Sequence, residues 1–253
     1  MLYISFLTRA YDEPYYHVPT LENYAKVFVD GFHWEVMGIT FWFAVVTALV
    51  TLLLGYPLAY YMARTTSRRK GVLLALVLAP LLVGVVVRSY GWMILLADTG
   101  LVNQFLAWIG IGGRRLMYNE TGVWIGLIHV YLPFMVISLM NAIAAIDPEL
   151  EKASRSLGAS GWRTFWRVTW PLSLPGVAAG AVLVFVLSVS AYVIPTLLGG
   201  YNVFTSPLLV VQTVMDLFNW PLGSAMAMVL FAVTIAVITI FNRVVARATR
   251  GLG

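Results

Sequence analysis

The sequence predicts an all-α polytopic membrane protein, on the strength of its composition, its long uncharged stretches and the placement of its basic residues. The chain has 253 residues, of which 60% are hydrophobic and only 11% are charged. Soluble domains carry about 25% charged residues, so this composition excludes an ordinary soluble protein, and its hydrophobicity excludes a disordered chain. The absence of cysteine excludes disulfides and thiolate chemistry.

Five stretches are apolar enough to cross a bilayer. A helix needs about 20 apolar residues to span the hydrocarbon core. The longest run without a charge, 168–215, has 48 residues and contains internal proline and glycine, so it must hold more than one element. We therefore predict five transmembrane helices, near residues 36–63, 72–97, 121–146, 174–198 and 222–243.

The basic residues predict which side of the membrane each loop occupies. Eleven of the sixteen lysines and arginines follow the first, third and fifth predicted helices. Cytoplasmic loops carry the excess of Lys and Arg, so we place these loops and the tail 244–253 inside, and the acidic segment 1–35 outside. Basic residues dispersed over three loops argue against nucleic-acid binding. The eleven are Arg64, Arg68, Arg69, Lys70, Lys152, Arg155, Arg163, Arg167, Arg243, Arg247 and Arg250.

The segment 147–171 has the signals of two short helices joined by a turn. Asp147 is a favourable N-cap, Pro148 suits the first helical position, and Gly158 is placed to end that helix as a left-handed residue. A second helix is predicted from Gly161. By helix physics alone, the loop is either an interfacial connector or a docking element for a cytoplasmic partner. The second helix carries an aromatic stripe at helical spacing: Trp162, Phe165, Trp166 and then Thr169.

This loop resembles the cytoplasmic-loop signature of ABC importer permeases, which reads Glu-Ala-Ala, three residues, Gly, nine residues, Ile-x-Leu-Pro. With Gly158 on the signature glycine, Val168 and Pro171 fall on the Ile and Pro positions. The Glu-Ala-Ala positions hold Lys152-Ala153-Ser154, so the middle alanine is kept. The acidic position is a lysine, and Glu151 stands one residue earlier.

The resemblance covers most of the chain and is closest to the spermidine/putrescine (PotB-like) family of these permeases. Members usually have six spans, so the first is expected to be missing here, with residues 2–7 as its remnant. The segments that carry the resemblance are 20–24, 55–60, 88–92, 100–103, 131–135, 147–150, 195–200 and 219–221.

The resemblance implies a type I ABC importer permease fold with cytoplasmic coupling helices, acting in a binding-protein-dependent, ATP-driven importer of the bacterial inner membrane. It implies as partners an ABC ATPase dimer, a second, homologous (PotC-like) permease, an extracytoplasmic solute-binding protein and membrane lipid. The chain has no Gly-x-x-x-x-Gly-Lys-Ser/Thr sequence, so ATP is expected on the separate ATPase and no cofactor on this chain. Polyamines are the expected solutes, and opines, phosphonates and ferric iron are the alternatives.

Two groups of site residues are expected. The resemblance implies that the loop residues Glu151, Ala153, Leu157, Gly158, Ala159, Val168 and Pro171 couple the permease to the ATPase. Polar and aromatic residues near or inside the predicted helices are candidates for the translocation pathway: Arg88, Tyr90, Trp92, His129, Tyr131, Tyr192 and Asp216.

Most pathway candidates have a structural alternative, and Asp216 would either attract a cation or contact the binding protein. Arg88 either lines a cavity or pairs with Asp98 or a partner, and its charge would repel a polyamine. His129 is either a pathway group or a core imidazole. The aromatic candidates are either cation–π surfaces or interfacial belt residues. An intramembrane enzyme is the rival class, but it would need clustered acid, base or metal groups, so we expect a transport subunit rather than an enzyme.

Overall fold

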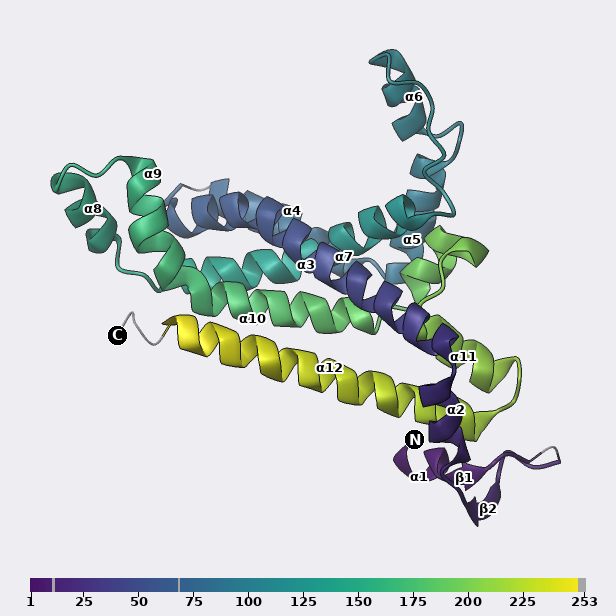
Figure 1. Ribbon diagram of the computed structural model, residues 1–253. Helices are drawn as coiled ribbons and strands as arrows, with labels where there is room; N and C mark the ends of the chain where they lie inside the picture. Colours follow the sequence, from purple (N-terminus) through teal and green to yellow (C-terminus); the bar gives the residue numbers. More distant parts are fainter. Residues whose placement is uncertain (11, 68, 250–253) are drawn as a thin grey trace. The chain divides into compact units, whose positions relative to one another are not determined.

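The computed structural model describes residues 1–10, 12–67 and 69–249, which are mostly helical (Figure 1). The chain divides into two compact units, each assembled from three stretches of sequence. Unit 1 comprises Met1–Val45, Val85–Leu127 and Leu187–Ala236. Unit 2 comprises Val46–Gly84, Ile128–Val186 and Val237–Gly253. Four helices contribute residues to both units: α3 (Gly31–Arg64), α7 (Glu120–Ala144), α10 (Trp170–Val189) and α12 (Trp220–Thr249).

Unit 1 also contains the short N-terminal elements and the segments that precede α7 and α12. Strands β1 and β2 pair antiparallel, and the buried Asn23 amide donates to the carbonyls of Ser5 and Leu7, 3.1 and 2.9 Å away. The further elements of unit 1 are α1 (Leu2–Ser5), β1 (Leu7–Thr8), β2 (Tyr16–Pro19), α2 (Glu22–Val29), α5 (Val85–Leu96), α6 (Leu101–Trp108), the π-helix η3 (Pro195–Gly199), the 3₁₀-helix η4 (Gly200–Asn202) and α11 (Ser206–Met215).

The core of unit 1 joins α2, α3, α11 and α12. Val27, Met37 and Met226 are among its buried members, and Leu209 of α11 packs against them. Where α7 begins, a Cβ at Gly126 would lie only 2.5 Å from Leu198 of η3, so glycine is required for this close approach.

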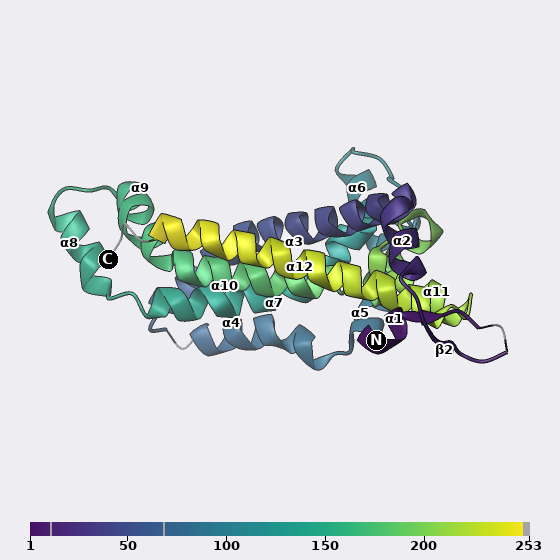
Figure 2. The same ribbon diagram turned by 60° about the horizontal axis from the view of Figure 1, so that its bottom comes forward.

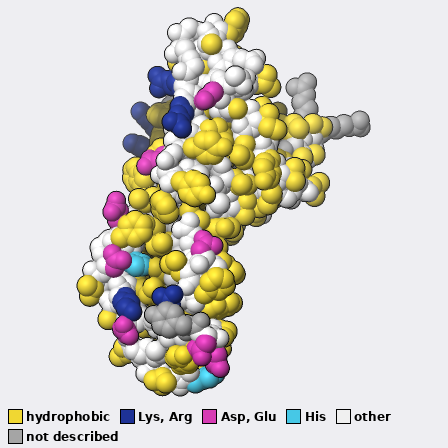
Figure 3. Space-filling model, turned by 90° about the vertical axis from the view of Figure 1, so that its right-hand side faces the viewer, with side chains coloured by type: hydrophobic (Ala, Val, Ile, Leu, Met, Phe, Trp, Pro, Cys, Tyr) yellow, Lys and Arg dark blue, Asp and Glu magenta, His cyan; other side chains and the backbone are white. Residues whose placement is uncertain are grey.

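Acidic side chains gather at the end of unit 1 formed by the N-terminal segment. Most of the Asp and Glu side chains visible in Figure 3 lie in its lower half, with Lys and Arg side chains among them and hydrophobic side chains between them. The segment 1–35 contains five acidic residues against two basic ones. The N-terminal segment is therefore an acidic part of unit 1.

Unit 2 is a packed group of helices with a core made by α3, α7 and α10. The helices α7 and α10 run side by side (Figures 1 and 2). A Cβ at Gly176 of α10 would collide with Ala142 of α7, and one at Gly180 would lie 2.8 Å from the sulfur of Met135. Small residues are therefore what allow these two helices to approach. The other elements of unit 2 are α4 (Arg69–Leu78), the 3₁₀-helix η1 (Ala79–Leu82), α8 (Pro148–Ser156), α9 (Gly161–Thr164) and the π-helix η2 (Phe165–Thr169).

The described residues contain five helical segments long and apolar enough to cross a membrane. The bent pair Pro195–Asn202 and Ser206–Met215 would be a sixth if it is one broken span. The five are Gly31–Arg64, Val85–Trp108, Glu120–Ala144, Gly161–Val189 and Trp220–Arg247. The all-α polytopic fold with five spans is thus confirmed, although individual bounds differ from those predicted.

The predicted span 72–97 is divided in the structure. Helix α4 ends at Leu78, the 3₁₀ turn η1 contains Pro80, and Val83 is extended before α5 begins at Val85. Proline lacks the N–H that would continue the helix, and its ring clashes with the preceding turn. Apolar composition alone does not reveal this break, and the candidate span instead starts at Val85 and continues to Trp108.

The predicted span 174–198 is displaced toward the N-terminus. Its helix continues unbroken from Gly161 and ends at Val189, and Pro195 then begins the separate π-helix η3. Helix α12 continues beyond the predicted span 222–243 and remains helical to Thr249, within the predicted tail 244–253. Arg68 and residues 250–253, with Arg250, lie outside the described residues.

Candidate functional site

The loop between α7 and α10 has the predicted caps and turn. The Asp147 carboxylate accepts the N–H of Glu149 at 2.9 Å, and Pro148 opens α8. Gly158 follows the helix with φ +83°, a left-handed conformation that side chains with a Cβ rarely adopt. A Cβ there would meet nothing within 4 Å, so glycine is needed for backbone conformation and not for space.

The second helix of the loop is not the isolated short helix that the sequence predicts. Ser160 caps α9 by accepting the N–H of Arg163, and the chain then passes through the π-helix η2 directly into α10. The hydroxyls of Ser154 and Thr164 lie 3.1 Å apart and join α8 to α9. The loop is therefore fixed to α10 by continuous helical backbone.

The aromatic stripe divides into an exposed and an inward part. Trp162 is 71% exposed, whereas Phe165 and Trp170 each lie 5.4 Å from the ring of Tyr56 on α3. Trp166 bridges the two parts, 5.5 Å from Trp162 and 5.6 Å from Trp170. The inward rings pack the start of α10 against α3, and the outer rings remain on the surface.

Among the predicted coupling residues, those around the turn are the accessible ones. Leu157 is 89% exposed, and Ala153 and Gly158 are also exposed. The three predicted coupling residues that follow the turn are half-buried: Ala159, Val168 and Pro171. The turn thus has an exposed leucine beside an exposed glycine at the end of a short helix.

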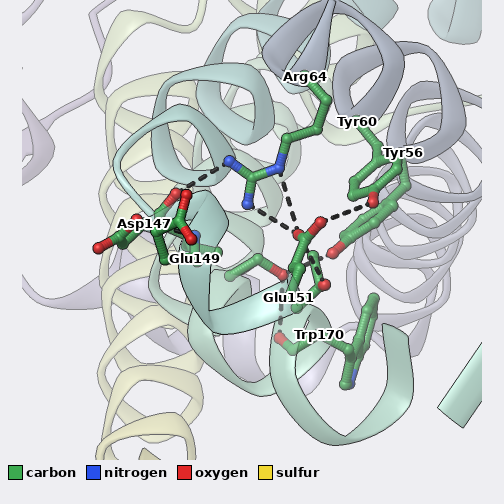
Figure 4. A network of polar contacts seen from close by, with 10 residues as sticks. Tyr56, Tyr60, Arg64, Asp147, Glu149, Glu151 and Trp170 are labelled. Carbon is green, nitrogen blue, oxygen red and sulfur yellow. Dashed lines mark hydrogen bonds and ion pairs between the residues drawn. The ribbon is translucent and has the colours of Figure 1, made fainter. Parts of the chain in front are cut away.

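Glu151 points the other way. Its carboxylate is buried and accepts hydrogen bonds from three side chains, as Figure 4 shows. Arg64 at the end of α3 donates to Oε1 through Nη2 at 2.8 Å and through Nε at 3.2 Å. Thr169 of η2 donates to the same oxygen at 3.0 Å, and Tyr60 donates to Oε2 at 3.0 Å. The remaining nitrogen of Arg64, Nη1, donates to the carbonyl of Ile146 at 2.9 Å.

This network keeps Glu151 ionised. Burial raises the pKa of Glu151, but the hydrogen bonds from Arg64, Thr169 and Tyr60 favour the charged form and bring the pKa below its ordinary value. The neighbouring pair Lys152–Glu149, at 2.7 Å, is fully solvated by comparison, with both side chains about 70% exposed. Two carboxylates on one short helix thus have different roles, because a shift of two positions turns a side chain to another face.

Sequence reasoning placed Glu151 in the loop but missed its partners. The charge pattern identifies Arg64 only as one of the inside-facing charges and indicates no role for Tyr60 or Thr169. The linear sequence offers a weak signal, which is that Arg64 is the first charge after 28 uncharged residues. Nothing in that pattern indicates contact with a residue 87 positions later.

The predicted pathway residues are not all brought together. In unit 1 a cavity of about 820 Å³ is lined by Tyr192 and Asp216, and also by Arg115, which the sequence analysis did not select. The other wall residues that bear on its chemistry are Tyr118, Thr196, Tyr201 and Gln212. Asp216 and Arg115 form no ion pair with another described residue.

On one wall of this cavity, Tyr118 has an unfavourable backbone conformation that hydrogen bonds hold in place. Tyr118 has φ +58°, which is uncommon for a residue other than glycine. Its N–H donates to the carbonyl of Leu198 at 2.8 Å, and its carbonyl accepts from the Asn202 amide at 2.9 Å. Strain of this kind persists only where surrounding contacts impose it, and it concentrates at functional sites.

The other pathway candidates lie elsewhere. Arg88, Tyr90 and Trp92 belong to α5 in unit 1 and do not line the cavity, and Tyr90 is exposed. In unit 2, His129 and Tyr131 of α7 are half-buried, and Tyr131 packs beside the helical core. Of the seven, the structure places only Tyr192 and Asp216 at one cavity.

Comparison with known families decides what kind of protein carries these features. The family described as binding-protein-dependent transport system inner membrane component matches residues 55–251. The chain belongs to this family. The permease is 35% identical over 242 residues to the spermidine/putrescine transport system permease protein PotB of Salmonella typhimurium strain LT2, covering 94% of this chain and 84% of that protein. The PotB protein of Escherichia coli K12 is also 35% identical, over 229 residues that cover 89% and 82%.

Solved structures agree with this assignment at the level of the fold. A bacterial alginate ABC transporter in complex with a pentasaccharide-bound periplasmic protein matches with a TM-score of 0.78 at 17% identity, covering 91% of the permease and 84% of that chain. The MetNI methionine ABC transporter matches with a TM-score of 0.64 at 16% identity, covering 88% and 100%. The predicted type I importer permease fold is confirmed, as is the prediction of a transport subunit rather than an enzyme.

Proposed function

We propose that the permease imports polyamines as one transmembrane subunit of an ATP-driven complex. The observation that carries this proposal is the 35% identity to PotB over 94% of the chain. The partners would be an ABC ATPase dimer that binds the ATP, a second, PotC-like permease and an extracytoplasmic solute-binding protein. No cofactor would be held by this chain.

The loop supports the proposal of an ATPase partner. Leu157 and the Gly158 turn are exposed at the end of α8, and Trp162 is exposed on the next helix. Solvated apolar side chains of this size favour burial against another protein. We infer that these residues, with Ala153, dock on the ATPase, and that Ala159, Val168 and Pro171 shape the loop behind them.

The orientation follows from the charges. Every described lysine and arginine assigned to the inside belongs to unit 2, and the acidic segment 1–35 belongs to unit 1. Under the excess of basic residues on cytoplasmic loops, unit 2 contains the inside loops and unit 1 the outside ones. The N-terminus of this chain would be outside and its C-terminus inside.

The cavity of unit 1 supports an organic cation as solute. Its wall includes the Asp216 carboxylate and the rings of Tyr118, Tyr192 and Tyr201. A carboxylate attracts ammonium groups, and tyrosine rings contribute cation–π attraction. Arg115 on the same wall opposes a cation, so its removal should strengthen uptake while removal of Asp216 weakens it.

Purification and transport test the proposal together. The complex is solubilised gently from native membranes, its chains are identified by mass spectrometry, and it is reconstituted with its binding protein for uptake of labelled spermidine and putrescine. We expect ATP-dependent uptake, and about a fivefold loss in Asp216→Asn, because one charge contact in a solvated site is worth about 1 kcal/mol. Asp98→Asn is the matched control, since Asp98 is an exposed acid of unit 1 outside the cavity.

Two results would contradict the proposal. The permease could purify alone under conditions in which a known importer stays assembled, which would remove the ATPase partner. Alternatively, the assembled complex could import an opine, a phosphonate or ferric iron and not a polyamine, which would remove the polyamine assignment and leave the importer class intact.

A further inference from the structure

The carboxylate of Glu151 accepts its hydrogen bonds from side chains of this chain. Its two oxygens accept four hydrogen bonds, from Arg64, Tyr60 and Thr169. The side chain is 9% exposed, and that of Arg64 is 16% exposed. A carboxylate so enclosed does not reach an external partner, so its role in the loop differs from that of the exposed Leu157.

Chain connectivity shows what the contact adds. The loop helices are joined covalently to α7 through residues 145–147 and to α10 through η2. Helix α3 has no such link to the loop, because Arg64 precedes Glu151 by 87 residues. The side chains of Tyr60 and Arg64 therefore supply the attachment between the end of α3 and α8.

The Glu151 carboxylate connects three elements, because it belongs to α8 and accepts hydrogen bonds from α3 and η2. Thr169 donates to it from the π-helix η2, and the Ser154–Thr164 contact holds α8 against α9. A π-helical turn inside an α-helix is uncommon and is frequent at functional sites. Here it brings the Thr169 hydroxyl to the oxygen that also receives Arg64.

Stability alone is a poor reason for this arrangement. Buried ion pairs are often no more stabilising than well-packed apolar side chains of similar volume, because both charges lose their water. What an ion pair supplies and an apolar contact does not is a single directed geometry, in this case between Arg64 and Glu151. With this geometry fixed, a displacement of Glu151 also displaces Arg64.

We propose that Arg64 and Glu151 are positioning residues that make the end of α3 move with the loop helices when an ATPase displaces them. This inference rests on the proposed function, since it needs an ATPase acting on the loop. Helix α3 is helical from Gly31 to Arg64, with Pro57 inside it, and its residues Tyr56 and Met62 pack in the core of unit 2, so a displacement at Arg64 acts on that packed part of the helix. The ion pair then belongs to the coupling between ATP hydrolysis and transport rather than to docking.

The first test measures the number of solute molecules imported per ATP hydrolysed in the reconstituted importer. The double variant Arg64→Met/Glu151→Met removes the pair and leaves no unpaired charge. We expect it to assemble and hydrolyse ATP, with solute imported per ATP reduced about tenfold, within the usual range of coupling effects. Glu149→Gln is the matched control, because it breaks the exposed pair on the same helix, and it should keep the wild-type ratio.

The second test begins with the pair intact and stays decisive if the double variant fails to assemble. The chain has no cysteine, so Tyr61→Cys on α3 and Ser156→Cys on α8 introduce two specific sites for spin labels, both at exposed positions. In an importer that still takes up solute, the distance between the labels should be the same in the nucleotide-free and ATP-bound states. Adding Glu151→Gln should broaden this distance distribution.

Two outcomes would overturn the inference: a double variant that assembles and keeps the wild-type ratio, or an interlabel distance that changes with nucleotide in the intact pair. Failure of the proposed function looks different. In that case the wild-type complex itself would contain no ATPase, or would import nothing upon ATP hydrolysis, before any variant of Arg64 or Glu151 was made.

Discussion

An arginine and a carboxylate lie in the same region twice in this chain, and only in one region do they form an ion pair. In unit 2, Arg64 and Glu151 meet at 2.8 Å, with both side chains largely buried. In unit 1, Arg115 and Asp216 line one cavity, but neither forms an ion pair with another described residue. The difference shows that one pair is neutralised by the fold itself, whereas the other two charges are available to something that enters the cavity.

The largest expected effect comes from removing one arginine of each region. Arg64→Ala leaves Glu151 buried without its counter-charge, which should cost roughly 3–5 kcal/mol of stability. Arg115→Ala removes an exposed charge and should change stability by less than about 0.5 kcal/mol. Thermal unfolding of the purified complex, followed by tryptophan fluorescence, measures both. Equal effects for the two variants would mean that the regions do not differ as described.

A smaller difference in stability is expected between alanine variants at the two glycine turns. Gly158 and Gly200 both have positive φ, +83° and +57°, and alanine at Gly158 should cost about 1–2 kcal/mol of backbone strain. Gly200 has ψ −139°, a region populated almost only by glycine, so the backbone strain of alanine there should be larger. At Gly200 the added Cβ would also lie 2.8 Å from Cδ1 of Tyr118, which adds about 1–3 kcal/mol of overpacking. Gly200→Ala should therefore be the more destabilised variant in the same unfolding assay. The reverse order would show that the cavity wall yields more easily than its contacts indicate.

The smallest effect is a pH dependence confined to the loop. Since the folded-state pKa of Glu151 is lowered, its ionic contribution is complete above the ordinary value of 4.5 and is lost as pH falls below it toward the folded pKa. Wild-type stability should thus be constant relative to Arg64→Met/Glu151→Met from pH 7 to 5.5, and should decline relative to it below pH 4.5. Unfolding temperatures measured across this range test the sign. A wild-type stability that rose relative to the double variant as the pH fell would contradict it.

The sequence predicted features that depend on local chemistry. Asp147, Pro148 and Gly158 act within one or two turns, so their types and spacing were enough to predict α8 and its left-handed ending. Apolar composition likewise predicted the membrane helices. It failed at Pro80, where a local break inside an apolar run divides the predicted span.

Long-range features were not predictable from these patterns. The Arg64–Glu151 contact joins residues 87 apart, and the cavity collects residues from Met93 to Asp216. The sequence favours Tyr192 because its ring can supply a cation–π surface, and it favours Asp216 because that residue is the only acid in the last predicted outside loop. The sequence favours Arg88 because it is a charge inside a predicted span, yet Arg88 does not line the cavity, since composition does not specify which face of a helix a side chain occupies.

The separation of Arg64 and Glu151 also has a consequence for how the chain is made. A ribosome completes α3 before it has synthesised α7 or α8, so the Arg64 guanidinium emerges with no carboxylate to receive it. Closing this contact requires a loop of 87 residues, and the entropy of that closure is recovered only when Glu151 arrives. The pair can therefore form only after the nascent permease has completed α7 and begun α8.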